Sequence, residues 1–305
     1  MSASQPRGRH VLREGALDGV AADAILARAS GENFPVAQRL LPRRVRGHLM
    51  AIYGFARLAD HLGDEVSDGG STAFAGDRLA LLDVLEADLD AVFEGTPRHS
   101  LLRDLVSTVR ACGLPREPFQ RLIEANRQDQ RVHRYASWEE LRGYCALSAD
   151  PVGHLVLGVF GVATPERLEA SDAICTALQL VEHAQDVAED RRAGRVYLPA
   201  CALEAEGCPE RDLDAASASP ALRRVIAAVA ERAAQDLRQG EPLVGSLSGS
   251  ARLAVAGFVA GGFAAVDSLH RVGFDVLSAT PRTRRRDVVR HALAVLARSL
   301  GSQTL

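Results

Sequence analysis

Apolar residues recur three and four positions apart along most of the chain, which is the spacing of one buried helical face. Leu79, Leu82, Leu85 and Leu89 form one such series. No run of β-branched residues alternates with polar ones, so strands are not indicated. The pattern predicts an all-α protein with helices at 16–29, 43–65, 75–94, 98–112, 115–130, 137–149, 151–161, 165–192, 220–239, 243–272 and 281–300.

Residues that begin and end helices stand where this pattern requires them. Ser137 followed by Glu140 is a capping box, and Thr164 and Ser219 each precede a proline at a first helical position. Glycines stand where helices would end, at positions 95, 113, 194 and 273. The connections are short and no repeat of solenoid length occurs, so we predict a single domain over residues 1–305 with its core at about 30–279.

The composition excludes several classes of enzyme and partner. All 36 residues of the Lys+Arg count are arginines, whereas P-loop NTPases, protein kinases and Schiff-base enzymes each need a lysine. The formal net charge is −3, whereas a nucleic-acid-binding domain usually carries a strongly basic face. We therefore expect no nucleic-acid partner, and we interpret the arginine-rich run 282–290 as a solvated terminal helix.

Features that report the cellular compartment favour the cytoplasm. The five cysteines are scattered without a CxxC or zinc-type spacing, which is typical of free thiols in a reducing compartment. The beginning of the chain has no apolar stretch of the kind found in signal peptides. The longest apolar run, 253–266, has 14 residues, fewer than the ~20 that span a bilayer, and predicts a buried helix. Peripheral contact with the inner face of the membrane is the alternative for this run.

Two of the predicted helices carry a polar stripe on an otherwise apolar surface, because residues three, four and seven positions apart share a helical face. The stripe in 43–65 consists of Tyr53, Arg57, Asp60 and Asp64. The stripe in 165–192 consists of Gln179, Glu182, Asp186 and Asp190.

Each stripe contains two aspartates four positions apart, and carboxylates at this spacing repel each other at neutral pH. Mg²⁺ binds oxygen ligands, commonly one or two carboxylates together with substrate phosphates. Two such faces across a cavity would therefore suit a magnesium-bound diphosphate. Aspartate pairs at this spacing also arise by chance, so a pair of solvated helix faces is the alternative for either motif taken alone.

With their surroundings, these stripes resemble the squalene and phytoene synthase family, the head-to-head branch of the trans-isoprenyl diphosphate synthases. The resemblance covers residues 30–279 and is strongest to the bacterial branch of the hopanoid pathway that forms hydroxysqualene. The segments that carry it are 31–44, 53–65, 127–130 (RQDQ), 144–153 (YCALSADPVG), 179–190 and 194–199 (GRVYLP).

The resemblance implies an isoprenoid-synthase fold, an all-α bundle around a central cavity, in which aspartate-rich helices hold Mg²⁺, with Mn²⁺ as a substitute. The metal ligands that it implies are Asp60, Asp64, Asp186 and Asp190. The catalytic residues that it implies are Tyr53, Tyr144, Asp60 and Asp186. The substrate-binding residues that it implies are Arg57, Gln179, Glu182, Arg195 and Tyr197. A packed core tyrosine is the alternative for Tyr53 and for Tyr144.

Three positions depart from the family pattern. His61 stands where many relatives have a second consecutive aspartate, and Glu182 stands where asparagine is common. Gln185 stands where condensing members often carry an arginine that contacts the diphosphate. Because this arginine is missing, the first condensation of two farnesyl diphosphates is in doubt.

Other polar residues near the motifs have no role that spacing explains. His154 and His183 have apolar neighbours along their helices and are expected to be packed rather than catalytic. Asp129 lies between two glutamines in the RQDQ segment, and the resemblance places it near the rim of the active site.

We weigh three functions. The leading one is the magnesium-dependent conversion of presqualene diphosphate into hydroxysqualene, with release of diphosphate, in squalene and hopanoid biosynthesis. The first alternative is a condensing synthase that joins two farnesyl or geranylgeranyl diphosphates head-to-head, giving presqualene diphosphate, squalene or phytoene. The second alternative is a non-catalytic isoprenoid-binding protein.

The resemblance also implies partners. The substrate would be presqualene or farnesyl diphosphate, and a synthase and a desaturase of the same pathway are the expected partner enzymes. NADPH is not indicated, since no glycine fingerprint of a dinucleotide site follows a predicted strand.

Overall fold

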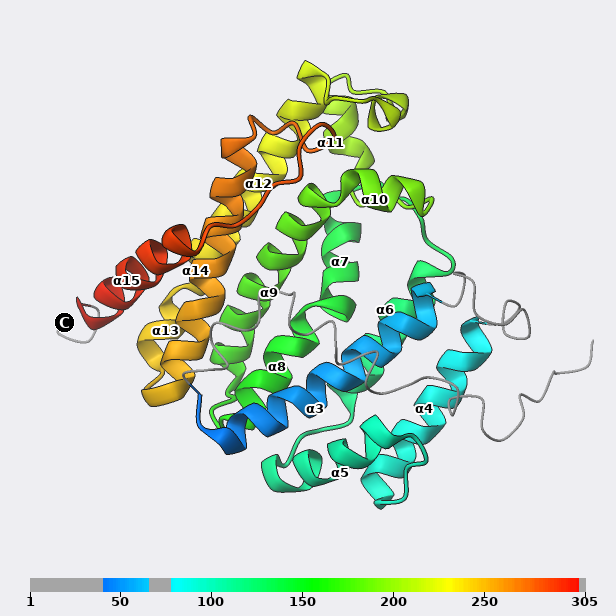
Figure 1. The fold of residues 1–305 in the computed structure, drawn as a ribbon, viewed down its shortest axis with the longest axis vertical. Helices are drawn as coiled ribbons and strands as arrows, with labels where there is room; N and C mark the ends of the chain where they lie inside the picture. Colours follow the sequence, from blue (N-terminus) through cyan, green and yellow to red (C-terminus); the bar gives the residue numbers. More distant parts are fainter. Residues whose placement is uncertain (1–40, 66–77, 302–305) are drawn as a thin grey trace, which may run out of the picture.

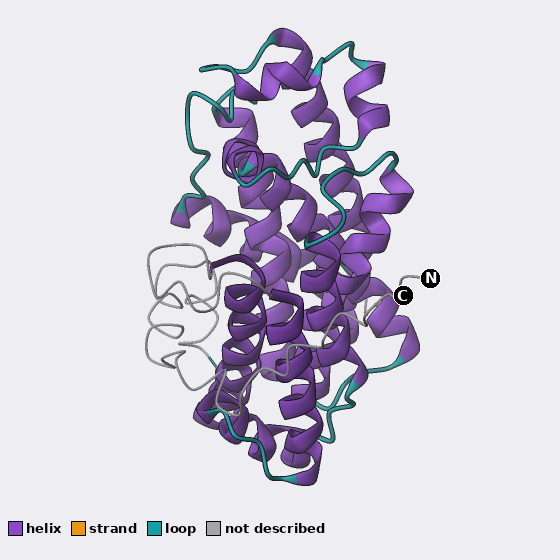
Figure 2. Cartoon of the chain, turned by 90° about the vertical axis from the view of Figure 1, so that its right-hand side faces the viewer, coloured by secondary structure: helices purple, strands orange, loops and turns teal. Residues whose placement is uncertain are grey.

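The computed structural model describes residues 41–65 and 78–301, except for the side chains of residues 64 and 65. Within these ranges the chain is helical and contains no β-strand (Figure 1; Figure 2). The predicted all-α class is therefore confirmed. The elements are α3 (Arg43–Asp60), η2 (His61–Glu65), α4 (Arg78–Glu94), α5 (Ser100–Cys112), α6 (Glu117–Asp129), α7 (Trp138–Ser148), α8 (Asp150–Val159), α9 (Pro165–Gln185), α10 (Val187–Arg192), α11 (Ala200–Ala205), η3 (Glu210–Asp214), α12 (Pro220–Gly240), α13 (Pro242–Ser246), α14 (Gly249–Arg271) and α15 (Arg285–Gly301).

The long helix α9 lies in the middle of the bundle and packs against α8, α12 and α14 (Figure 1). Buried apolar side chains form one large cluster around α9, α12 and α14, and a second among α3, α4, α5 and α6. Helix α6 joins the two, since Ala125 belongs to the first cluster and Leu122 to the second. Both residues line the same cavity, which therefore lies between the two halves of the core.

The signals for helix ends are confirmed. The Ser137 hydroxyl accepts the backbone N–H of Glu140 at 3.2 Å, Thr164 caps α9 in the same way, and Ser219 caps α12. The Glu140 carboxylate accepts the N–H of Ala136 rather than that of Ser137, so the capping box is displaced by one residue. The glycines at 95, 113, 194 and 273 all have positive φ, between 59° and 91°, which fits their place after helices.

Three predicted helices are divided in the structure. The helix predicted at 243–272 is wrong as a single element, because Leu247 and Ser248, with extended backbone at ψ of 165° and 166°, separate α13 from α14. The helix predicted at 165–192 is interrupted at Asp186, whose φ and ψ are −100° and 15°. Val187 is the one buried residue of α10, so this short helix has no apolar periodicity from which its separation from α9 could be predicted. The predicted helix 16–29 lies outside the described residues.

The helix predicted at 43–65 changes at His61 into the single π-helical turn η2. Such turns occur often at functional sites. Gly63 in this turn lies directly against the side chain of Asn126 on α6, and a Cβ at this position would lie 2.3 Å from the Asn126 Oδ1 atom. The backbone of η2 therefore approaches α6 more closely than a residue with a side chain would allow.

The apolar run 253–266 lies in α14, Gly249–Arg271, and most of its side chains are buried. Among the described residues this is one helix that is long and apolar enough to cross a membrane, but 61% of its apolar window is buried inside the protein. This burial is typical of a core helix and confirms the predicted buried helix. All five cysteines are free thiols, as predicted.

Candidate active site

A cavity of about 250 Å³ opens between α3, α6, α7, α9 and α10. Nine of the residues singled out in the sequence line it together. They are Arg57, Asp60, Tyr144, Gln179, Glu182, Asp186, Asp190, Arg195 and Tyr197. The two polar stripes, more than a hundred positions apart in the chain, therefore contribute to one cavity.

Two predicted site residues are not brought into this cavity by the described structure. Tyr53 lies on α3, four residues before Arg57, and is not among the residues that line the cavity. Asp64 belongs to η2, and its side chain lies outside the described part of the chain. His61, in the same turn, is half-buried and does not line the cavity either.

The carboxylate of Asp60 is oriented by two neighbours. Arg57, one helical turn before it on α3, places its Nη1 atom 3.5 Å from the Asp60 Oδ2 atom. The Asn126 amide donates to the Asp60 Oδ1 atom at 3.3 Å and also to the carbonyl of Leu122 at 3.1 Å. Asn126 was missed in the sequence, because its contact with Asp60 spans 66 positions and follows from the close approach at Gly63.

Burial disfavours the ionised forms of the second acidic group, which consists of Asp186 and Asp190. Burial raises the pKa of Asp190 to about 7, the charge of Arg195 opposes this shift, and the nearby Asp186 and Glu182 carboxylates add to it. Burial and then the charge of Glu189 raise the pKa of Asp186. The ionised forms of these carboxylates are therefore short of positive charge.

The donor set fits Mg²⁺ in chemistry, because the cavity presents carboxylate oxygens from α3, α9 and α10 and a shortage of positive charge. Within the described ranges, however, no three His, Cys, Asp or Glu side chains lie close enough to hold a metal by themselves. Any ion bound here would thus need oxygen ligands from elsewhere, as Mg²⁺ commonly takes from substrate phosphates.

Asp129 joins the tyrosines of the cavity. Its Oδ2 atom accepts the Tyr144 hydroxyl at 2.7 Å, and its Oδ1 atom accepts the Tyr197 hydroxyl at 2.8 Å. Burial, and then the charge of Asp129, raise the pKa of both tyrosines well above the usual range. Both hydroxyls therefore stay protonated, and each proton is directed at Asp129.

Rings pack around these hydroxyls, and three of them, those of Tyr144, His183 and Tyr197, form an aromatic wall of the cavity. Tyr135 lies 5.5 Å from Tyr144 and 5.7 Å from Tyr197, measured between ring centroids. His183 stacks on Tyr197 at 3.9 Å. Burial lowers the pKa of His183 to about 3, with a contribution from the charge of Arg195, so the imidazole is neutral. His183 is packed, as predicted, but it also lines the cavity.

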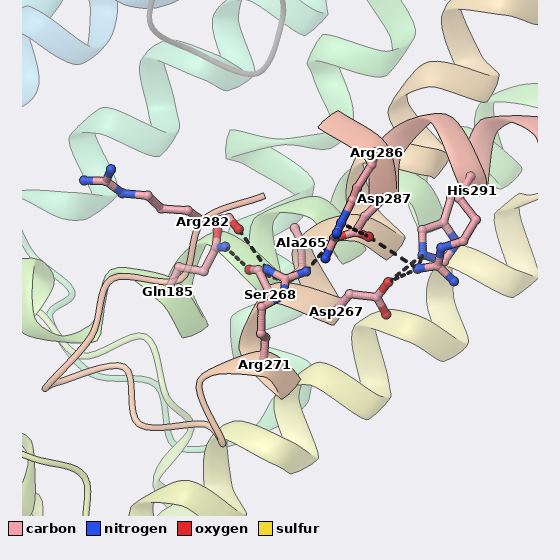
Figure 3. Close-up of polar contacts among 10 residues, drawn as sticks. Gln185, Ala265, Asp267, Ser268, Arg271, Arg282, Arg286, Asp287 and His291 are labelled. Carbon is pink, nitrogen blue, oxygen red and sulfur yellow. Dashed lines mark hydrogen bonds and ion pairs between the residues drawn. The ribbon is translucent and has the colours of Figure 1, made fainter. Parts of the chain in front are cut away.

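Gln185 is directed away from the cavity. Its amide donates to the hydroxyl of Ser268 on α14 at 3.1 Å (Figure 3). The Ser268 side chain is fully buried and itself donates to the carbonyl of Ala265. His154, on α8, pairs with Asp172 at 2.7 Å and lies outside the cavity, in agreement with the structural role expected for it.

The carboxylates and arginines that meet in this cavity suit a diphosphate bound through Mg²⁺, because Mg²⁺ takes carboxylate and phosphate oxygens and the arginine fork donates to phosphate. The model of the squalene/phytoene synthase family matches residues 27–289, so the chain belongs to this family of enzymes. The family resemblance inferred from the motifs is thereby confirmed.

Individual relatives agree with this assignment. The chain is 38% identical over 217 residues to a hydroxysqualene synthase of Rhodopseudomonas palustris, which covers 71% of each protein. It is 33% identical over 206 residues to a presqualene diphosphate synthase of the same organism, which covers 67% of this chain and 71% of the relative. The crystal structure of the squalene synthase HpnC from Alicyclobacillus acidocaldarius superimposes with a TM-score of 0.74 at 42% identity, covering 83% of this chain and 94% of that one. The isoprenoid-synthase fold is therefore confirmed.

Proposed function

We propose that this enzyme converts presqualene diphosphate and water into hydroxysqualene and diphosphate, in a reaction that depends on Mg²⁺. The observation that carries the proposal is the position of Gln185. Where condensing relatives often have an arginine, this chain has an amide that is bonded to Ser268 and directed away from the cavity. Arg57 and Arg195 line the cavity and are left to contact a single diphosphate. The 38% identity to a hydroxysqualene synthase supports the same choice.

The diphosphate would bind between the two acidic groups. The forked donors of Arg57 and Arg195 suit its oxygens, with Gln179 and Glu182 at its side. Asp60 and Asp64 on one side, and Asp186 and Asp190 on the other, would hold the magnesium ions. Bound magnesium supplies electrostatic stabilisation of the negative charge that develops on the leaving diphosphate.

The wall of aromatic rings would serve the carbon half of the reaction. When the C–O bond breaks, the electron pair leaves with the diphosphate and a carbocation remains, which tyrosine ring faces stabilise. Tyr144 and Tyr197 lie at this wall, whereas Tyr53, for which the sequence predicted a catalytic role, does not line the cavity. A neutral His183 adds no charge that would repel the cation.

Asp129 would orient the two tyrosine hydroxyls that bind the attacking water molecule. Since both tyrosine protons are directed at Asp129, the Tyr144 and Tyr197 oxygens have only lone pairs to offer the cavity. They would accept hydrogen bonds from a water molecule, whose own lone pair is then free to attack carbon. After attack the water gives up a proton to the released diphosphate, and the product is an alcohol.

One observation favours a second candidate. The chain is 33% identical to a presqualene diphosphate synthase over a similar length, so a condensing activity that joins two farnesyl diphosphates is the alternative. This reaction needs two diphosphates in the active site at once, and Gln185 offers no charge to the second.

Product analysis distinguishes the two. The purified protein is incubated with Mg²⁺ and either presqualene diphosphate or farnesyl diphosphate, and the products are identified by mass spectrometry. We expect hydroxysqualene from presqualene diphosphate, no turnover of farnesyl diphosphate and no effect of NADPH. Formation of presqualene diphosphate from farnesyl diphosphate would contradict the proposal.

The same assay tests the metal ligands. Asp60→Asn and Asp186→Asn should each abolish magnesium-dependent release of diphosphate. Asp104→Asn, at an exposed position of α5 outside the cavity, is the matched control and should retain activity. Full activity in both cavity variants would show that these carboxylates do not hold the metal.

A further inference from the structure

The last described helix, α15, has two apolar sides. Its inner side packs on the bundle through Val295, which is fully buried. Its outer side exposes Val289, Leu293 and Leu300, at 56%, 65% and 60% of their surface. These three residues are four and seven positions apart, so they share one face of the helix, which we call the outer face of α15. Isolated exposed apolar residues are common, whereas a row of three on one helix indicates a surface that another body covers.

Contacts with the bundle at both ends of α15 hold the helix, and with it the outer face, in a fixed orientation. Arg271 on α14 bonds to the carbonyl of Arg282 and to the carboxylate of Asp287, and Asp267 accepts from His291, as Figure 3 shows. At the other end Arg298 forms two hydrogen bonds to Glu241. The outer face is therefore not needed for the attachment of α15 to the bundle.

The segment that leads into α15 and the first turns of the helix are strongly positive, and Arg285, four positions before Val289, lies on the same side as the outer face. Around the beginning of α15 lies an arginine cluster made up of Arg282, Arg284, Arg285, Arg286 and Arg290. All five side chains are exposed, and the stretch contains one acidic residue, Asp287, which Arg271 already engages. Arg282, Arg284 and Arg285 form no ion pair with any described residue, although the chain as a whole has a net charge of −3.

We propose that the outer face of α15 and the arginine cluster dock the enzyme on an anionic lipid bilayer. Helices that lie in a membrane interface combine an apolar face with arginines or lysines, and each basic residue is attracted to anionic headgroups. A second copy of the chain fits less well, because two outer faces packed on each other would bring two arginine clusters together. The proposal is independent of which reaction the enzyme catalyses.

A tryptophan probe tests the docking directly. Both probes are introduced with Trp138→Phe, so that each variant has a single tryptophan. Leu293→Trp keeps an apolar residue at the centre of the outer face, and Ser107→Trp, at an exposed position of α5, is the matched control. We expect the emission of the Leu293→Trp variant to move to shorter wavelength when vesicles of phosphatidylglycerol and phosphatidylcholine are added. Pure phosphatidylcholine vesicles should have little effect, and the control variant should not respond to either.

Co-sedimentation with the same vesicles tests the two components separately. Leu293→Gln and the double variant Arg284→Gln/Arg285→Gln should each lower the vesicle partition coefficient about tenfold or more. Arg211→Gln/Arg238→Gln, which removes two exposed arginines elsewhere, should leave it unchanged. Circular dichroism of each variant checks that the fold is kept.

Two results would overturn the proposal. If the emission of the Leu293→Trp variant is already at short wavelength without lipid, a second copy or another part of the chain covers the outer face. If the natural protein and the Arg284→Gln/Arg285→Gln variant partition equally onto phosphatidylglycerol vesicles, the arginine cluster does not recognise anionic headgroups. Both measurements need no substrate, so their outcome is distinct from that of the activity assays.

Discussion

At the scale of single residues, Asp129 organises the most polar part of the aromatic wall. It binds tyrosines that lie 15 and 68 positions away in the chain, and its two oxygens are both occupied by their protons. No local pattern in the sequence reports such an arrangement, because the contacts are made between α6, α7 and the segment after α10. Its neighbours Gln128 and Gln130 have structural partners, the Tyr135 hydroxyl and the carbonyl of Gly63.

The substitution Asp129→Asn tests the positioning role of this residue. An amide accepts through one atom and donates through the other, so one tyrosine proton would turn toward the cavity. We expect kcat to fall about 100-fold, the usual effect of losing one preorganised polar contact in an active site. The products should also shift from the alcohol toward hydrocarbons formed by loss of a proton, which mass spectrometry measures.

Tyr135→Phe is the control for this substitution. Its hydroxyl accepts from Gln128 and does not touch Asp129, so the ring packing is kept while the Asp129 bonds are unchanged. We expect kcat and the product ratio to stay near those of the natural protein. An unchanged product ratio in Asp129→Asn, with reduced kcat, would indicate a purely structural role.

At the scale of elements, the first turn of α8 contains a buried acid. Asp150 is 5% exposed and accepts the Thr176 hydroxyl of α9 at 3.1 Å. Burial raises the pKa of Asp150 from its ordinary value of 3.8 to about 7, and the charge of Asp172 adds to the shift, while the bond from Thr176 opposes it. The packing of α8 on α9 therefore favours the protonated acid.

The substitution Asp150→Asn should stabilise the protein above neutral pH. The folded chain keeps the Asp150 proton up to about pH 7, whereas the unfolded chain loses it near pH 3.8. The free energy of unfolding that this proton contributes is therefore complete below about pH 4 and is lost as the pH rises to about 7. The amide has no proton to lose. We expect a gain on the order of 2 kcal/mol in the free energy of unfolding at pH 8, measured by urea denaturation.

The gain should shrink below pH 7 and vanish near pH 4. Asp104→Asn, at an exposed site on α5, serves as the control and should show little effect at any of these pH values. A gain of the same size at pH 4 and pH 8 would show that Asp150 acts through packing rather than through its proton.

At the scale of the whole molecule, the two halves of the core meet around the cavity. Asp60 comes from the half built by α3 to α6, whereas Asp186 and Asp190 come from the half built around α9. A ligand that bridges these carboxylates would bind the folded protein but not the unfolded chain, and would stabilise both halves together.

Magnesium and inorganic diphosphate added together should therefore raise Tm. At a concentration 100 times Kd, binding adds about 2.7 kcal/mol, which corresponds to roughly 5 °C for a chain of this size. Thermal denaturation followed by circular dichroism measures the shift. Asp186→Asn should lose most of it and Asp104→Asn should keep it. An equal shift in Asp186→Asn would place the bound ion elsewhere.

The sequence by itself determined the helical class and most helix ends, because apolar period and caps are local properties, and its resemblance to the family predicted the nine residues that line one cavity. Tertiary structure alone decided the break at Asp186, the π-helical turn at His61, the partners of Asp129 and the direction of Gln185. Each of these depends on contacts between segments far apart in the chain, such as Gly63 against Asn126 or Gln185 on Ser268. A pattern of neighbouring residues contains no information about such contacts until the helices have packed.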